Sequence, residues 1–193
     1  MAIGAAAIGR PDVVKVARPW LERLVAATDE TVHMSVLDVS GGIVYISKVE
    51  SPRSIRVQTQ IGQLSPAWCT ATDAASSPST PLPPSGSSPR RCWRAHPKTV
   101  TDPRRIRAVL KQISVAGYAV TRAENHPEMG GIAAPIRDHA GTVIAAVGVG
   151  VPDFRMTREL EEKCVPHVVE AAAGISFELG FRPDESRSSA VRA

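Results

Sequence analysis

Two segments of alternating apolar and polar residues, each interrupted by a glycine-containing turn, constrain the fold of this chain most strongly. The first spans residues 31–46 around a turn at 40–42, and the second spans residues 132–149 around a turn at 138–141. A period of two is typical of β-strands, and a short glycine turn between two strands predicts a hairpin. The sequence therefore predicts two hairpins and a mainly antiparallel sheet.

Three further segments have the three- and four-residue apolar spacing of helices. They cover residues 11–28, 103–116 and 157–179. Pro19 predicts a kink or break in the first and Pro166 a kink in the last, because proline removes one helix hydrogen bond and clashes with the preceding turn. The order of helix, strands, helix, hairpin and helix predicts an α+β domain whose antiparallel sheet is covered by helices.

Local signals add detail around these elements. Asp102 is a favoured N-cap and Pro103 a favoured first helical residue, and Gly117 is a C-terminal stop signal. Residues 118–120 look like a short strand that follows this stop. Alternation across residues 55–58 predicts one more strand, more exposed than the others.

A low-complexity tract interrupts this pattern. From Ser76 to Pro89, thirteen of fourteen residues are Ser, Pro, Thr or Gly. Burying so few apolar groups cannot offset the entropy of ordering the chain, so an extended, mobile loop is expected there.

The sequence lacks the signatures of the common enzyme classes and metal sites. It has no GxGxxG, GxxxxGK[ST], HExxH or GxSxG motif, and Cys69, Cys92 and Cys164 form no CxxC pair. We expect no enzyme activity, no metal and no cofactor, and free thiols. His33 is expected to face solvent, and Asp138 is expected to serve a turn.

Charge and hydropathy indicate which partners and which cellular location to expect. The net charge of +4 arises largely from basic residues between 90 and 107. These residues are equally compatible with phosphate contacts and with solvated surface charge. No apolar run approaches the length that spans a bilayer, and the N-terminus has no basic region typical of a signal peptide. A cytoplasmic location without membrane contact is therefore expected.

Small residues gather where the second hairpin would meet its neighbours. Gly130 and Gly131 precede one strand, and Gly148 and Gly150 lie at the end of the other. Small residues either leave space for a ligand or let backbones pack closely, and both explanations stay open.

Several motifs, in their order and spacing, resemble the effector domain of the IclR family of bacterial transcriptional regulators. The resemblance covers residues 16–181, and its motifs are residues 17–24, 48–52, 62–66, 99–103, 117–120 and 132–138. Residues 1–15 then read as the remnant of a linker and residues 182–193 as a disordered tail.

The resemblance implies a GAF-like domain that forms a homodimer or homotetramer and senses a small organic or aromatic acid. It also implies the residues of the effector site: Ala71, Thr72, Thr121, Gly131, Ile132, Gly148 and Gly150. Family members often carry Cys at the position of Gly131 and Ser at the positions of Gly148 and Gly150. Glycine at all three predicts a roomier and less polar pocket.

The chain departs from the family pattern in two places. The winged helix that binds DNA in the family would precede this domain, so DNA contact is expected only through such a domain, missing from this chain. The Ser/Pro-rich segment 73–94 stands where the family has a helix that covers the pocket. Two compensating frameshifts or a divergent loop would each explain it.

Alternative interpretations follow from these departures. The chain could be a free-standing small-molecule-binding protein that never contacts DNA, or a degenerate fragment without function. An enzyme that uses Cys69 or a histidine is a third alternative, and no other sequence feature supports it.

Overall fold

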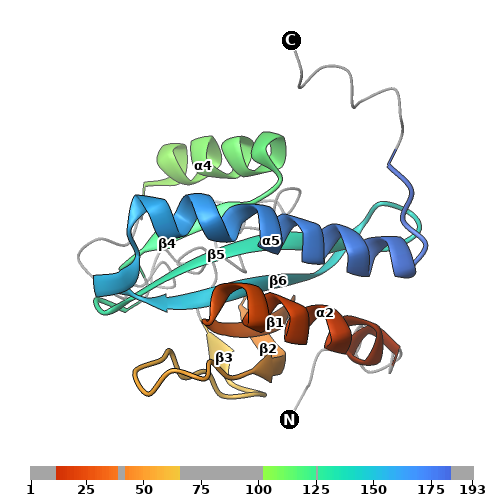
Figure 1. The fold of residues 1–193 in the computed structure, drawn as a ribbon. Helices are drawn as coiled ribbons and strands as arrows, with labels where there is room; N and C mark the ends of the chain where they lie inside the picture. Colours follow the sequence, from red (N-terminus) through yellow and green to blue (C-terminus); the bar gives the residue numbers. More distant parts are fainter. Residues whose placement is uncertain (1–11, 39–41, 66–101, 125, 184–193) are drawn as a thin grey trace.

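The computed structural model describes residues 12–38, 42–65, 102–124 and 126–183 (Figure 1). The helices are α2 (Asp12–Thr28), α4 (Pro103–Ala116) and α5 (Arg158–Glu178), with a short 3-10 helix, η2 (Asp153–Arg155). The strands are β1 (Thr31–Leu37), β2 (Ile43–Val49), β3 (Leu64–Ser65), β4 (Ala119–Arg122), β5 (Met129–Arg137) and β6 (Val143–Pro152).

All six strands form one antiparallel sheet in the order β3-β2-β1-β6-β5-β4. Both predicted hairpins are confirmed, as β1–β2 and β5–β6. The first hairpin joins the second through β1 and β6, with Thr31 opposite Gly150 and Ser35 opposite Ala146. The first and last long strands of the domain therefore lie together at the centre of the sheet.

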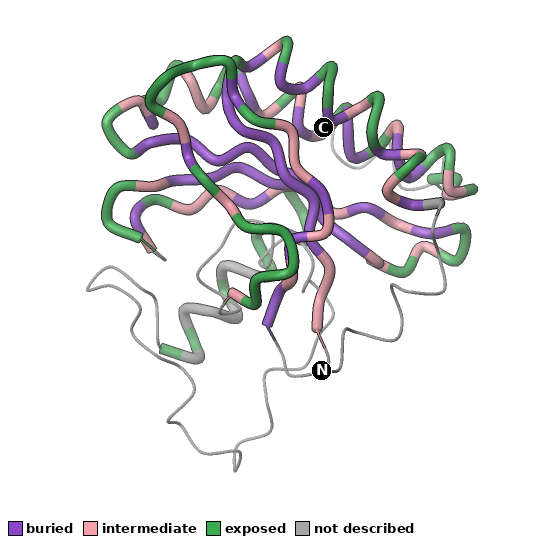
Figure 2. The backbone as a smooth tube through the Cα atoms, turned by 90° about the horizontal axis from the view of Figure 1, so that it is seen from below, coloured by how far each residue is buried: buried purple, intermediate pink, exposed green. Residues whose placement is uncertain are grey.

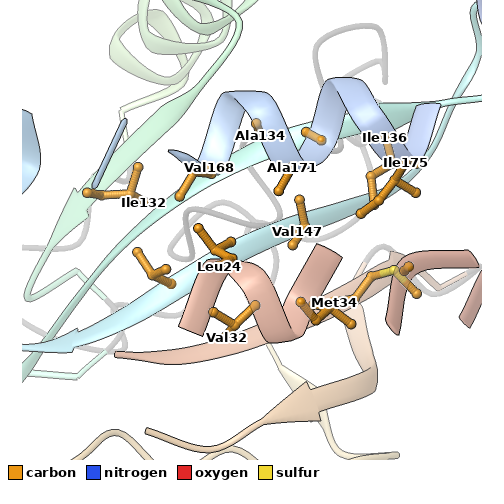
Figure 3. Close-up of a cluster of buried hydrophobic side chains, with 14 of the residues drawn as sticks. Leu24, Val32, Met34, Ile132, Ala134, Ile136, Val147, Val168, Ala171 and Ile175 are labelled. Atoms are coloured by element: carbon orange, nitrogen blue, oxygen red, sulfur yellow. The ribbon is translucent and has the colours of Figure 1, made fainter. Parts of the chain in front are cut away.

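Helices α2 and α5 cover one face of this sheet, which we call the helix face (Figure 1). Alternate residues of the central strands point into it, among them Val32, Met34, Ile132 and Val147, where they meet Val168 and Ile175 of α5 (Figure 3). Each of these side chains is completely buried. At about 1.5–3 kcal/mol for each large apolar side chain, this core supplies most of the stabilisation of the fold.

Helix α4 packs against the opposite face of the sheet. Its Ile113 forms a buried apolar cluster with Ala119, Ala133 and Ala146 of β4, β5 and β6. The sheet is thus covered on both sides, and its central strands are buried along most of their length (Figure 2). The resulting α+β arrangement is the one predicted.

The structure confirms both predicted ends of α4. Asp102 caps the helix by accepting a hydrogen bond from the backbone amide of Arg104 at 2.9 Å. Gly117 ends it in the left-handed conformation, with a φ of 78°. The turn between β5 and β6 is also as expected, since Oδ1 of Asp138 accepts hydrogen bonds from the amides of Ala140 and Thr142, each at 3.0 Å.

Two sequence predictions are wrong in detail. Residues 55–58 form no strand: Val57 is buried in an irregular segment, Ile55 is exposed, and the third strand is instead the short β3. Helix α2 has no break at Pro19, where a kink or a break is predicted. Pro19 and Lys15, whose carbonyl loses its helical partner, are both exposed. That carbonyl is therefore within reach of water.

The expected segment boundaries are only partly within the described residues. Residues 12–15 of the expected linker belong to α2, whereas the Ser/Pro-rich segment 73–94 lies outside the described residues, as do 184–193 of the tail. In the described part of the chain, no helix combines the length and apolar character needed to cross a membrane.

Candidate functional site

The sheet face opposite α2 and α5 is composed mainly of small residues in its central strands. One row across the strands is Thr121, Gly131, Gly150 and Thr31, and the next row is Ala119, Ala133, Gly148 and His33. Because side chains alternate along each strand, both rows point away from the helix face. We call this surface the small-residue face.

The predicted site residues are only partly brought together here. Thr121, Gly131 and Gly150 are direct neighbours in one row, and Gly148 lies in the adjacent row. Ile132 follows Gly131 in β5, so its side chain points to the opposite face of the sheet. It is buried in the core of the helix face (Figure 3). Ala71 and Thr72 lie outside the described residues.

The two glycines of β6 do not leave the open room that the family resemblance predicts for the pocket. A Cβ atom at Gly148 would lie 2.6 Å from the carbonyl oxygen of Ile132 and 2.7 Å from Cβ of Ala133. A Cβ atom at Gly150 would lie 3.0 Å from Cγ1 of Val57 and 3.3 Å from Cε1 of His33. Protein atoms therefore occupy the space that a larger residue would need at both positions.

These contacts predict different effects for two matched substitutions. Gly148→Ala should lower the free energy of unfolding by about 2 kcal/mol, because the backbone of β5 must move to relieve the clash. Gly150→Ala should cost less, because it meets side chains that can shift. Urea unfolding of both variants checks this, and equal effects would contradict the packing described for Gly148.

His33 is the largest difference from the sequence prediction. Its ring is buried instead of facing solvent, with 7% of its surface exposed, and it packs edge-on against Tyr45 of β2 with ring centroids 4.9 Å apart. Burial lowers the pKa of His33 from its ordinary 6.5 to about 4. Ser35, two residues along β1, is completely buried on the same face.

An ion pair fixes the segment that carries Val57 over this face. Arg155 of η2 binds Glu30 in a bidentate manner at 2.8 and 2.9 Å and also donates to the carbonyl oxygen of Ile55 at 2.9 Å. Glu30 is 1% exposed. Arg155 therefore links the end of β6 to the start of β1 and to the segment just before Val57.

Other groups that could carry chemistry are dispersed in the described residues. No cluster of three or more His, Cys, Asp or Glu side chains suited to a metal ion occurs there. Cys164 is a free thiol in the core of the helix face, and burial raises its pKa. Cys69 and Cys92 lie outside the described residues.

Residues 5–177 match the family profile described as bacterial transcriptional regulator IclR C-terminal. The chain belongs to the IclR family. The resemblance identified from the motifs is therefore confirmed, and this chain corresponds to the effector-binding domain of such a regulator.

Individual IclR-type proteins support the assignment. The chain is 28% identical to HTH-type transcriptional regulator KdgR of Escherichia coli, over 93% of this chain and 68% of KdgR. It is 32% identical to HTH-type transcriptional regulator BhcR of Paracoccus denitrificans, over 94% of this chain and 65% of BhcR. The chain thus spans about two thirds of each relative. These relatives are transcriptional regulators and not enzymes, in agreement with the absence of enzyme motifs.

A solved structure confirms the fold. The C-terminal domain of the Escherichia coli transcriptional regulator KdgR superposes with a TM-score of 0.73 at 26% identity, covering 88% of this chain and 99% of that domain. The GAF-like antiparallel sheet with flanking helices is therefore the architecture of IclR C-terminal domains.

Proposed function

We propose that this domain senses a small organic or aromatic acid, which binds at the small-residue face. The observation that carries the proposal is the direct cross-strand row of Thr121, Gly131 and Gly150. These are residues implied as effector contacts by the family resemblance, and they come from three separate strands. Because Val57 packs over Gly150, the ligand is placed beside Thr121 and Gly131, where one hydroxyl next to a small residue suits a compact ligand with few polar groups.

The proposal extends to the assembly in which the domain works. We propose that it self-associates as a homodimer or homotetramer and acts on DNA only through a winged helix-turn-helix domain. KdgR and BhcR support the DNA-binding part of this proposal, since both are named as helix-turn-helix regulators and this chain spans about two thirds of each.

Thermal-shift screening tests the proposal. The purified chain is heated with a panel of small organic and aromatic acids and, as a control, with their uncharged amides. Binding to the folded state alone raises the melting temperature, by an amount equivalent to about 2.7 kcal/mol at a ligand concentration of 100 Kd. At least one acid should stabilise the chain more than its amide does. A folded chain that responds to no acid of the panel would contradict the proposal.

A further inference from the structure

Residues 51–57, which follow β2, join the small-residue face to the connection between α2 and β1. We call these residues the strap. Only its two ends are buried: Ser51 and Val57 are 5% and 6% exposed, whereas residues 52–55 are all exposed. The strap belongs to no helix or strand. A stretch with so few buried side chains is held in place mainly by the contacts at its ends.

One end of the strap lies over Gly150. If Gly150 carried a Cβ atom, that atom would lie 3.0 Å from Cγ1 of Val57 and 3.2 Å from Cβ of Val57. A new side-chain rotamer of Val57 relieves the first contact but not the second, because the Cβ atom moves only with the backbone. A group added at Gly150 therefore displaces the strap itself.

The other end of the strap holds Asp29, the residue directly after α2. Oγ of Ser51 donates a hydrogen bond to the carbonyl oxygen of Asp29 at 2.5 Å. The guanidinium of Arg53 donates to the carboxylate of Asp29 at 3.2 Å. The amide of Ser51 also donates to Oγ1 of Thr31 at 3.3 Å. Three hydrogen bonds thus tie the strap to the connection between α2 and β1.

Asp29 has a backbone conformation that depends on such support. Its φ is 58°, in the left-handed region that residues other than glycine adopt only at a cost. In this conformation its amide donates to the carbonyl oxygen of Val25 at 2.7 Å and closes the last turn of α2. The bonds from the strap therefore also stabilise the end of this helix.

The middle of the strap is bonded to the same connection through Arg155. This side chain donates to the carbonyl oxygen of Ile55 at 2.9 Å while it binds Glu30, the residue that follows Asp29. Glu30 is 1% exposed. Because the strap is bonded to residues 29–31 at several points, a shift of the strap changes the support of the end of α2.

We propose that the strap mechanically couples the packing over Gly150 to the last turn of α2. While Val57 packs against Gly150, Ser51 and Arg53 hold Asp29 in its left-handed conformation and the turn stays closed. Displacement of Val57 shifts the strap, weakens these hydrogen bonds and opens the turn. The coupling goes beyond the proposed function, because it is a property of the fold that requires no ligand.

Amide hydrogen exchange of the full chain, followed residue by residue by NMR, tests this inference. Gly150→Ala displaces Val57, whereas the matched variant Gly148→Ala meets only β5. Exchange at the amide of Asp29 should be about tenfold faster in Gly150→Ala and unchanged in Gly148→Ala, because this amide reports local opening of the helix end. Core amides that exchange by global unfolding should show the opposite order, because Gly148→Ala costs more stability. Equal exchange at Asp29 in the two variants would overturn the inference.

A double-variant cycle separates the strap from a second route along β1. A Cβ atom at Gly150 would also lie 3.3 Å from Cε1 of His33, a residue of β1. Ser51→Ala removes the hydrogen bond from the strap to Asp29, so Gly150→Ala should have little further effect on exchange at Asp29 in this background. A full tenfold effect in both backgrounds would show that the displacement travels along β1, and would overturn the inference.

The reverse direction supplies a test that needs no variant of β6. Coupling between two sites is reciprocal, so Ser51→Ala should loosen Val57. The two methyl groups of Val57 should then give more averaged NMR signals than in the parent chain. Ser47→Ala, which removes a buried serine of β2 outside the strap, should leave these signals unchanged. Unchanged Val57 signals in Ser51→Ala would overturn the inference, whereas the thermal-shift screen decides the proposed function separately.

Discussion

Arg155→Met is expected to lower the free energy of unfolding by about 3 kcal/mol. The substitution leaves the carboxylate of Glu30, which is 1% exposed, without its bidentate partner. Removing one member of a buried ion pair costs about 3–5 kcal/mol. We expect the lower end of that range, because Nε of Arg53 lies 3.9 Å from Oε1 of Glu30 and partly compensates. Urea denaturation followed by circular dichroism measures the change.

Arg158→Met provides a matched control three residues further along the chain. Its ion pair with Glu162 is a surface pair within α5, with the two side chains 85% and 65% exposed. Exposed pairs contribute at most about 1 kcal/mol, so this variant should be close to the parent chain. The double variant Glu30→Met with Arg155→Met should regain much of the lost stability, because it leaves no unpaired buried charge. Equal stability of the two single variants would contradict the role given to Arg155.

Acidification should destabilise the domain through His33. Its pKa is about 4 in the folded protein and 6.5 as an ordinary value, so the unfolded chain binds a proton at a higher pH than the folded one does. The stabilising contribution of the neutral ring is therefore fully present above pH 6.5. It is lost as the pH falls from 6.5 towards 4, and it amounts to about 3 kcal/mol in total.

The variant His33→Gln isolates this effect. The free energy of unfolding is measured for both proteins between pH 7 and the acid limit of folding, and their difference is plotted against pH. All other ionisable groups are shared, including Lys48 and Tyr45 on β2, which adjoin His33. The parent chain should lose stability more steeply than the variant below pH 6.5. Parallel curves would show that His33 is not buried in its neutral form.

The parts of the fold that depend on local sequence could be predicted. The hairpins follow from alternation and turn residues, and the ends of α4 follow from Asp102 and Gly117. The pairing of β1 with β6 could not be predicted in the same way, because no local pattern specifies which distant strands meet. The contact between Glu30 and Arg155, which are 125 residues apart, could not be predicted for the same reason.

The candidate site was predictable only in part. Alternation shows which residues of β1 share a face, but it does not show that both faces of the sheet are covered. His33 was therefore expected at the surface, although it lies between Tyr45 and the glycines of β6. The positions of Thr121, Gly131 and Gly150 came from the family resemblance, and their cross-strand register came only from the structure.

Mapping a bound acid by NMR tests the central claim most directly. The isotope-labelled chain is titrated with the acid that stabilises it most in the thermal-shift screen, and amide and histidine ring resonances are followed. If the acid binds at the small-residue face, the largest shifts should be those of Thr121, Gly131, Gly150 and the ring of His33. Shifts confined to the exposed surfaces of α2 and α5, with these four residues unchanged, would contradict the account.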